Sequence, residues 1–261
     1  MIAFKQFLDE ENTIDLINSS REEIQRFVTN TQGYDGDQFN YDNYDANQDY
    51  FKKYEMYLKY DVSYINRLFG ECIVNKSNMK LNVLLLGCGH LAEVYSFIET
   101  YDECGFEFPL NILVMDKILW PDNFLPDIRD LVLEKKKNIN VFFKKTDFII
   151  ELLNNSYDYF NIMYFSRCIN YLDYKRCNYE IKIEEYYKYL EKIIKKNNAV
   201  FGFSQVVKTD IYNDFALENE KDFLQILKCY KPIIFQGLTQ VRNISYYTED
   251  LNFYLYLIDN R

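Results

Sequence analysis

Histidine, tryptophan, proline and glycine are scarce in this chain: its 261 residues include one His, one Trp, four Pro and eight Gly. This composition excludes collagen-like, glycine-linker and proline-rich disordered proteins, and it makes each glycine informative. Six cysteines occur without a CxxC pair, and with His90 as the only histidine they lack the ligand spacing of a zinc site, so we expect no metal. Reduced cysteines of this kind are typical of an intracellular, cytoplasmic protein.

Long apolar runs and a basic excess are also missing. No run approaches the roughly 18 apolar residues that a membrane span needs, and the acidic N-terminus does not resemble a signal peptide. The chain has 30 Lys and Arg against 40 Asp and Glu, which gives a formal net charge of −10. Because phosphate neutralisation supplies most nonspecific nucleic-acid affinity, this balance disfavours a nucleic-acid partner, although a local basic patch is compatible with it.

The first 80 residues predict helices. Two overlapping Ser-x-x-Glu capping boxes, of which Ser20 and Glu23 form one, favour a helix that begins there and runs to about residue 29. Between about 50 and 69, aromatic and aliphatic residues recur at helical spacing and indicate an amphipathic helix. We therefore expect residues 1–80 to form a helical extension ahead of an α/β domain that spans 81–261.

From residue 81 onward, short continuous apolar runs alternate with helical patterns. Such runs are typical of strands that are buried on both faces of a parallel sheet, and the alternation predicts a doubly wound α/β fold. The expected strands cover 82–86, 111–115, 139–143, 159–165 and 199–206, and the expected helices cover 91–104, 124–137, 147–154 and 180–196.

Two further strand-like runs lie near the end of the sequence, at 232–247 and 253–258. The roughly five residues between them are too few for a parallel crossover, which needs about a dozen or more, so we expect an antiparallel hairpin. The predicted fold class is therefore α/β, with a doubly wound, mostly parallel seven-stranded sheet, an antiparallel C-terminal hairpin strand and an N-terminal helical cap.

The turn Gly87-Cys88-Gly89, between the first strand and the next helix, is the strongest chemical signal. Gly87 allows the chain to turn off the strand, and Gly89 lets a ligand approach the backbone. The following helix is expected to present free N–H groups to an electronegative ligand. Asp116 ends the second strand, where a carboxylate can accept two ribose hydroxyls, and Asp147 follows the third. We expect a ligand-binding site at this carboxyl edge of the sheet.

These features resemble the class I S-adenosylmethionine (SAM)-dependent methyltransferases, over roughly residues 80–261. The resemblance rests on Asn82–Cys104, Asp116, Thr146-Asp147-Phe148 and the terminal hairpin. It implies SAM as the cofactor, and an enzyme that transfers a methyl group to a nitrogen or oxygen nucleophile of a small molecule or a protein side chain. It further implies that the cofactor is bound by Gly87, Cys88, Gly89, Asp116, Lys117, Asp147, Phe148 and Ser166.

The resemblance also implies individual roles. The glycine turn would pack against the methionine part of the cofactor, Asp116 would hold the ribose hydroxyls, and Asp147 would accept the adenine amino group with Phe148 beside the ring. Two positions depart from the family's pattern. Leu85 stands where an acid is usual, two residues before the first glycine, and Leu91 stands where a third glycine is common.

The sequence does not name the methyl acceptor. The resemblance implies that the N-terminal extension covers the cofactor, and the candidate acceptor-binding residues are Tyr50, Tyr54, Tyr57 and Arg167. No catalytic base is identified, because methyl transfer depends mainly on proximity and alignment.

Two other interpretations stay open. Gly87-x-Gly89-x-x-Ala92 also fits the dinucleotide fingerprint, which would make the chain a nicotinamide-dependent oxidoreductase. Alternatively, the departures at Leu85 and Leu91 mark a catalytically silent partner subunit that has a methyltransferase fold.

Overall fold

The computed structural model describes residues 8, 11–31, 65–66, 70, 80–117, 119–120, 124–135, 138–166, 183–208, 233–241 and 251–259. Strands in these ranges are β1 (Thr13–Asp15), β2 (Leu81–Leu86), β3 (Leu110–Asp116), β4 (Ile139–Lys145), β5 (Ile162–Ser166), β6 (Val200–Lys208), β7 (Ile233–Val241) and β8 (Leu251–Asp259). Helices are α2 (Arg21–Thr31), α4 (Ala92–Glu103), α5 (Leu125–Lys135), α6 (Phe148–Asn154) and α8 (Ile183–Lys196).

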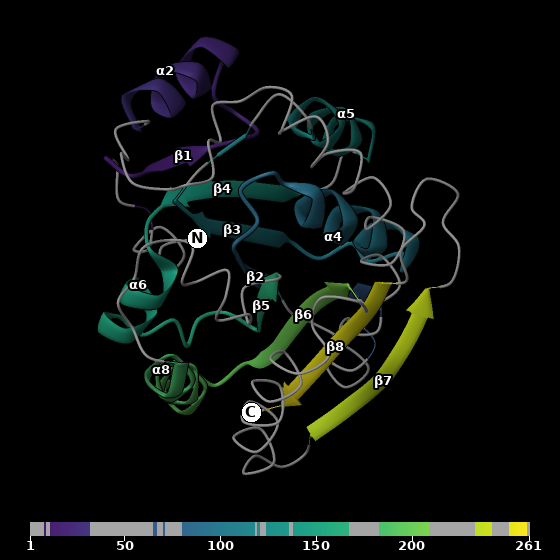
Figure 1. Ribbon diagram of the computed structural model, residues 1–261. Coiled ribbons are helices and arrows are strands. Elements are labelled where there is room, and N and C mark those ends of the chain that lie inside the picture. The colour runs from purple at the N-terminus through teal and green to yellow at the C-terminus, as the bar shows by residue number, and fades with distance from the viewer. Residues whose placement is uncertain are drawn as a thin grey trace.

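All eight described strands belong to one sheet, in the order β1-β4-β3-β2-β5-β6-β8-β7 (Figure 1). The strands β4, β3, β2, β5 and β6 pair in parallel. β8 runs antiparallel to both of its neighbours, β6 and β7. The predicted fold class is confirmed, including the C-terminal hairpin, because a short connection between neighbouring strands permits only the antiparallel arrangement.

One strand was not expected from the sequence. β1 lies at the edge of the sheet and pairs antiparallel with β4, with Ile14 opposite Phe143. At three residues it is too short to show an alternating pattern, so only its pairing partner reveals it. The helix that follows is the predicted one: Glu23 and Ser20 form a reciprocal capping box, with the Ser20 N–H donating to Glu23 and the Glu23 N–H donating to Ser20 Oγ.

β5 begins three residues later than expected, at Ile162. A turn precedes it, in which the Phe160 N–H donates to the Tyr157 carbonyl at 3.0 Å. Asn161 then bridges to the neighbouring strand, since its side-chain oxygen accepts the Asn82 N–H at 2.8 Å. The aromatic residues that extend the apparent strand in the sequence, Tyr159 and Phe160, therefore belong to the turn. Phe160 is buried in the core, and Tyr159 packs edge-on against it.

The core fills both faces of the sheet, and β2 is buried along its whole length. Val83 and Leu85 belong to the cluster that includes residues of α2, α4 and α5. Leu84 and Leu86 point the other way, into the cluster that includes residues of α6 and α8. Figure 1 shows α4 and α5 on one side of the sheet and α6 and α8 on the other. Burial of each of these side chains contributes about 1.5–3 kcal/mol, which explains the continuous apolar runs.

A ladder of asparagine side chains crosses the amino-terminal ends of three central strands. Asn82 of β2, Asn111 of β3 and Asn140 of β4 lie opposite one another in register. The Asn111 amide donates to Asn82 at 2.8 Å, and the Asn140 amide donates to Asn111 at 2.9 Å. Because a buried amide must be hydrogen-bonded, this ladder favours one register over its neighbours.

Among the helices in the described ranges, none has the length and apolarity that a membrane crossing requires. Of the two cysteines in the described ranges, Cys88 is buried and Cys104 is exposed.

Candidate functional site at the carboxyl edge of the sheet

The glycine turn joins β2 to α4 at the carboxyl edge of the sheet. Gly87 has a φ of 74°, a left-handed conformation that a residue without Cβ adopts at little cost. Its N–H donates to the Met115 carbonyl of β3 at 3.0 Å. The Cys88 thiol is buried and lies 3.6 Å from the Leu86 carbonyl. The predicted turn is therefore present, and it is hydrogen-bonded to the neighbouring strand.

Leu91 stands where a third glycine is common in the resembled family, and its backbone is left-handed. Its φ is 68°, and it is the one non-glycine residue with a positive φ among those that the structure describes. For an L-residue with a side chain this conformation costs roughly 1–2 kcal/mol. The Leu91 side chain is fully buried in the core beside α4, and that burial offsets the backbone cost.

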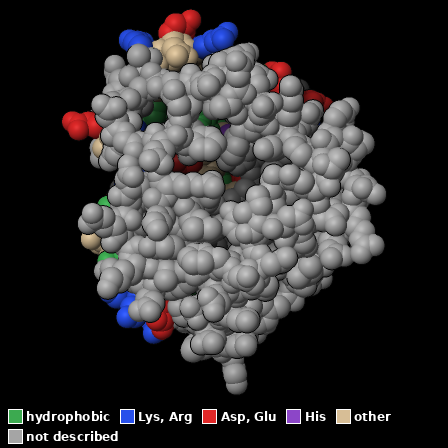
Figure 2. Space-filling model, in the orientation of Figure 1, with side chains coloured by type: hydrophobic (Ala, Val, Ile, Leu, Met, Phe, Trp, Pro, Cys, Tyr) green, Lys and Arg blue, Asp and Glu red, His purple; other side chains and the backbone are tan. Residues whose placement is uncertain are grey.

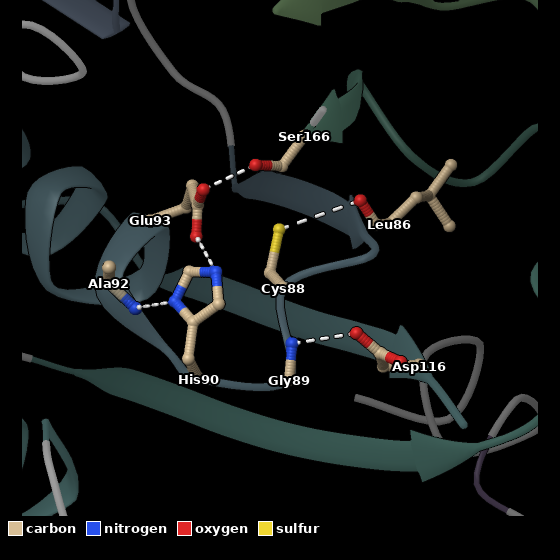
Figure 3. Close-up of polar contacts among 8 residues, drawn as sticks. All are labelled: Leu86, Cys88, Gly89, His90, Ala92, Glu93, Asp116 and Ser166. Carbon is tan, nitrogen blue, oxygen red and sulfur yellow. Dashed lines mark hydrogen bonds and ion pairs between the residues drawn. The ribbon is translucent and has the colours of Figure 1, made fainter. Parts of the chain in front are cut away.

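Asp116, at the end of β3, holds the glycine turn in place. Its Oδ2 accepts the Gly89 N–H at 2.8 Å (Figure 3). Its Oδ1 accepts the Lys117 N–H at 2.6 Å. The expectation of free N–H groups at the turn is thus corrected for Gly89, because Asp116 already accepts its hydrogen.

Asp147, after β4, contacts both the first turn of α6 and Lys117. Its Oδ1 accepts the N–H groups of Ile149 and Ile150 at 3.0 and 3.3 Å, which makes Asp147 the N-cap of α6. Its Oδ2 lies 3.3 Å from Lys117 Nζ in a mostly buried ion pair. Lys117 therefore links the end of β3 to the start of α6.

Two aromatic side chains and one lysine also lie at this edge. Phe148 packs edge-on against Phe165 of β5, with ring centroids 6.1 Å apart. Lys145 ends β4 opposite Asp116 of β3, and burial lowers the pKa of its ammonium group. The edge therefore combines apolar ring surface with charged groups of both signs.

A buried polar network connects the turn, the first helix and β5. Glu93, in the first turn of α4, accepts a hydrogen bond from Ser166 Oγ at the end of β5, and its other carboxylate oxygen lies 3.5 Å from His90 Nε2 (Figure 3). The exposed fractions of Glu93, His90 and Ser166 are 0%, 2% and 3%. Negative charge is favoured at this end of a helix by about 0.3–1 kcal/mol or more.

The chain's only histidine has a defined role in this network. His90 Nδ1 accepts the Ala92 N–H at 3.1 Å, so in the neutral ring the proton lies on Nε2, which faces Glu93. Both ring nitrogens are engaged within the protein. His90 therefore braces the turn, and this geometry does not present it as a general base.

The eight residues expected to hold a cofactor lie at the ends of four adjacent strands, β2, β3, β4 and β5. In Figure 2, acidic, histidine and apolar side chains are visible at depth near the centre of the face shown. Four residues expected to bind the acceptor lie outside the described residues: Tyr50, Tyr54, Tyr57 and Arg167. Within the described ranges no cluster of His, Cys, Asp and Glu is arranged to hold a metal ion.

Glu93 was missed at the sequence level. Its position three residues after His90, in the first turn of a helix, resembles an ordinary solvent-facing helix start. The available signal was its apolar neighbour one helical turn further along, because Phe97 is buried on the same face of α4. A polar residue on an otherwise apolar helix face is informative when burial is independently expected.

No protein-family model matches the sequence, and no curated protein matches it. Solved structures match it in shape. The bifunctional kinase-methyltransferase WbdD matches with 12% identity and a TM-score of 0.47, covering 78% of this chain and 39% of WbdD. The N-methyltransferase NodS from Bradyrhizobium japonicum WM9 matches with 12% identity and a TM-score of 0.43, covering 77% of this chain and 95% of NodS.

The plantazolicin methyltransferase BpumL, in complex with S-adenosylhomocysteine (SAH) and a monoazolic desmethylPZN analogue, matches with 14% identity and a TM-score of 0.48. That match covers 92% of this chain and 99% of BpumL. These likenesses concern the fold alone. The chain spans about two fifths of WbdD (39%), whose two activities belong to a longer protein.

Proposed function

We propose that this chain is a SAM-dependent methyltransferase that acts on a nitrogen or oxygen nucleophile of a small molecule or a protein side chain. The observation that carries the proposal is the placement of the glycine turn, Asp116 and Asp147 at the ends of three adjacent strands. The sheet supports it: antiparallel β8 lies between β6 and β7, whereas the common dinucleotide order, 3-2-1-4-5-6, has no such inserted strand.

The residues at this edge fit the chemistry of SAM. Asp116 stands at the carboxyl end of β3, and a carboxylate is a group that can accept ribose hydroxyls. Asp147 and Phe148 would border the adenine, and the ring of Phe148 is fixed by Phe165. The glycine turn and Ser166 would lie along the methionine part. The carboxylates of Asp116 and Glu93 at this edge suit a ligand that carries a cationic sulfonium and an ammonium group.

SAM supplies a methyl group on a positively charged sulfur that is open to attack by a nucleophile. The contribution of the protein is to hold the two reactants in line and to exclude water. The turn is well suited to the first task, because hydrogen bonds to β3 fix it at both Gly87 and Gly89. A general base is required only where the acceptor holds its proton tightly.

The same contacts weigh against a nicotinamide dinucleotide. A pyrophosphate is bound by free N–H groups at the N-terminus of the helix after the glycine turn. Here the Gly89 N–H donates to Asp116 and the Ala92 N–H donates to His90. Glu93 also places a carboxylate in the first turn of that helix, where it would repel a diphosphate.

The net charge of −10 supports a cationic or neutral acceptor over a long nucleic acid. Repulsion at long range slows the encounter of like-charged partners, whereas a neutral or cationic acceptor is not repelled. A nucleic acid would need a local basic surface to overcome this charge.

Titration calorimetry on the full chain is the first test. Binding of SAM and SAH without binding of NAD or NADP supports the proposal, and the reverse pattern supports the oxidoreductase. Binding of none of them favours the silent partner subunit. A second assay follows transfer of a radiolabelled methyl group from SAM into small-molecule, protein and RNA fractions of a lysate. Methyl label that enters RNA, together with RNA binding that weakens as the salt concentration rises, would refute the proposed acceptor class.

A further inference from the structure

Glu93 is a buried acid beside the proposed site. It lies near the sheet face on which Leu85 replaces an acid that is usual in the resembled family. The side chain of Leu85 lies in the same core cluster as Val94 of α4. Leu85 is paired in register with Tyr164 of β5, and Ser166, two residues further along, shares the face of Tyr164. Glu93 reaches Ser166 from α4. It therefore delivers a carboxylate to the face on which an acid at position 85 would stand.

The sheet order places this carboxylate at one end of the proposed cofactor. β2 lies between β3 and β5, so the glycine turn separates Asp116 from Ser166. A ligand with its ribose at Asp116 that crosses the turn towards β5 brings its other end to Ser166. For SAM or SAH that other end is the methionine part, which carries the ammonium group.

We infer that Glu93 is a positioning residue for the ammonium group of the cofactor and acts through Ser166; this inference rests on the proposed function. Ser166 Oγ donates its hydrogen to Glu93, so the lone pairs of the hydroxyl oxygen are available to accept an N–H. A carboxylate behind the hydroxyl makes that oxygen a stronger acceptor for a cation. Hydrogen bonds between ionised groups are roughly twice as strong as neutral ones.

His90 and the helix fix the direction of the Glu93 side chain. The His90 ring is held by the Ala92 N–H and stands 3.5 Å from one carboxylate oxygen, which leaves the other oxygen towards Ser166. Glu93 is fully buried, so its side chain has little freedom to turn away. The methionine end would thus meet a hydroxyl of fixed orientation, supported by three separate elements: the glycine turn, α4 and β5.

The test compares two ligands that differ at the end in question. SAH carries the ammonium group, whereas 5′-methylthioadenosine keeps the adenosine and a thioether and lacks the amino-acid part. Calorimetry on the full chain measures both ligands with Glu93→Gln and Ser166→Ala. Glu99→Gln is the matched control, because Glu99 is a hydrogen-bonded carboxylate on the same helix, where it accepts from the Tyr95 hydroxyl at 3.0 Å.

We expect Glu93→Gln and Ser166→Ala each to weaken SAH binding about tenfold to a hundredfold, the range for a lost charge-assisted hydrogen bond. Binding of 5′-methylthioadenosine should change by less than about twofold. The control should leave both affinities unchanged. Binding of 5′-methylthioadenosine also shows that each variant is folded.

Unchanged SAH affinity in both variants overturns the inference, and so does an equal loss for the two ligands, which would indicate a purely structural role. If circular dichroism shows that Glu93→Gln is unfolded, the same comparison with Ser166→Ala decides. Failure of the unmodified protein to bind either ligand removes the proposed function itself. Binding by the unmodified protein with unaffected variants removes only the role of Glu93 and Ser166.

Discussion

Asp116 at the end of β3 accepts the backbone N–H of Gly89 at 2.8 Å, across 27 residues of sequence. The bond ties the glycine turn to the neighbouring strand before any ligand is present. Asp116 thus has a structural task in addition to its proposed contact with ribose, and a variant can separate the two.

The Asp116 variants separate structure from binding. Asp116→Asn keeps one oxygen that can accept the Gly89 N–H, but its NH2 group faces the Lys117 N–H and its charge is lost. We expect a smaller loss of stability than for Asp116→Ala, and a loss of about 1–3 kcal/mol in SAH binding. Asp116→Ala should lose a similar binding free energy and also lower the urea midpoint. Calorimetry and urea denaturation measure the two effects, and an Asn variant with full affinity would remove Asp116 from the site.

At Leu91 we expect Gly to be more stable than Ala, which is the reverse of the order in a regular helix. Both substitutions remove a buried side chain at a cost of about 2–5 kcal/mol. Gly relieves the left-handed backbone at φ 68° and Ala does not, so Leu91→Gly should be the more stable of the two by about 1 kcal/mol. At Val94, in the regular helix, the order should be the ordinary one, with Ala above Gly. Urea denaturation of the four variants provides the measurement.

Asp147 combines a helix cap with an ion pair, and serine can retain the first alone. We expect Asp147→Ala to lower the free energy of unfolding by about 1 kcal/mol through loss of the α6 cap, and Asp147→Ser to lose much less. Both variants should bind SAH more weakly if the carboxylate faces the adenine. Normal affinity in Asp147→Ser would show that the carboxylate serves α6 and Lys117 only.

Glu151 makes the stability pH-dependent. Burial raises the pKa of this carboxyl, but hydrogen bonds from Lys144 and Tyr157 outweigh it and hold the pKa below its usual 4.5. The ionised form is thus favoured in the folded state. Its contribution to stability is present above about pH 4.5 and is lost as the pH falls through the lowered pKa of the folded state.

Glu151→Gln tests this pH dependence. Unmodified protein should be more stable than Glu151→Gln near neutral pH, and the difference should shrink as the pH falls below about 4.5. Urea midpoints across the acid range measure it, with Glu134→Gln, an exposed position on α5, as the control. A constant difference at all pH values would contradict the ionic origin.

The asparagine ladder predicts coupled energetics. Removing Asn111 leaves the Asn82 side-chain oxygen without this donor and the Asn140 amide with only the longer contact to Asn138 at 3.5 Å. This should cost about 1–3 kcal/mol for each group that stays buried. The pair Asn82→Ala and Asn111→Ala should therefore be less destabilising together than the sum of the single variants. A double-mutant cycle measures this, and strict additivity would show that the ladder contributes nothing as a unit.

Features of this protein that depend on local pattern can be predicted from the order of its residues. Continuous apolar runs indicate strands buried on both faces, as found for β2. The location of the glycine turn, Asp116 and Asp147 at one edge of the sheet was predictable, because each comes at the end of a predicted parallel strand. The hairpin follows from the short connection, because chain length alone forbids a parallel return.

Other features depend on contacts between residues that are distant in the sequence, so they appear only in the folded structure. β1 is a strand because it pairs with β4 at the edge of the sheet. Its three residues are too few to show a strand pattern in the sequence. Leu91 has an unfavourable left-handed backbone, and burial of its side chain in the core offsets the cost. Glu93 is buried because His90 and Ser166 are brought to it by the turn and by β5. In each case the stabilising contact joins separate elements, so its energy appears only once the sheet and helices are assembled.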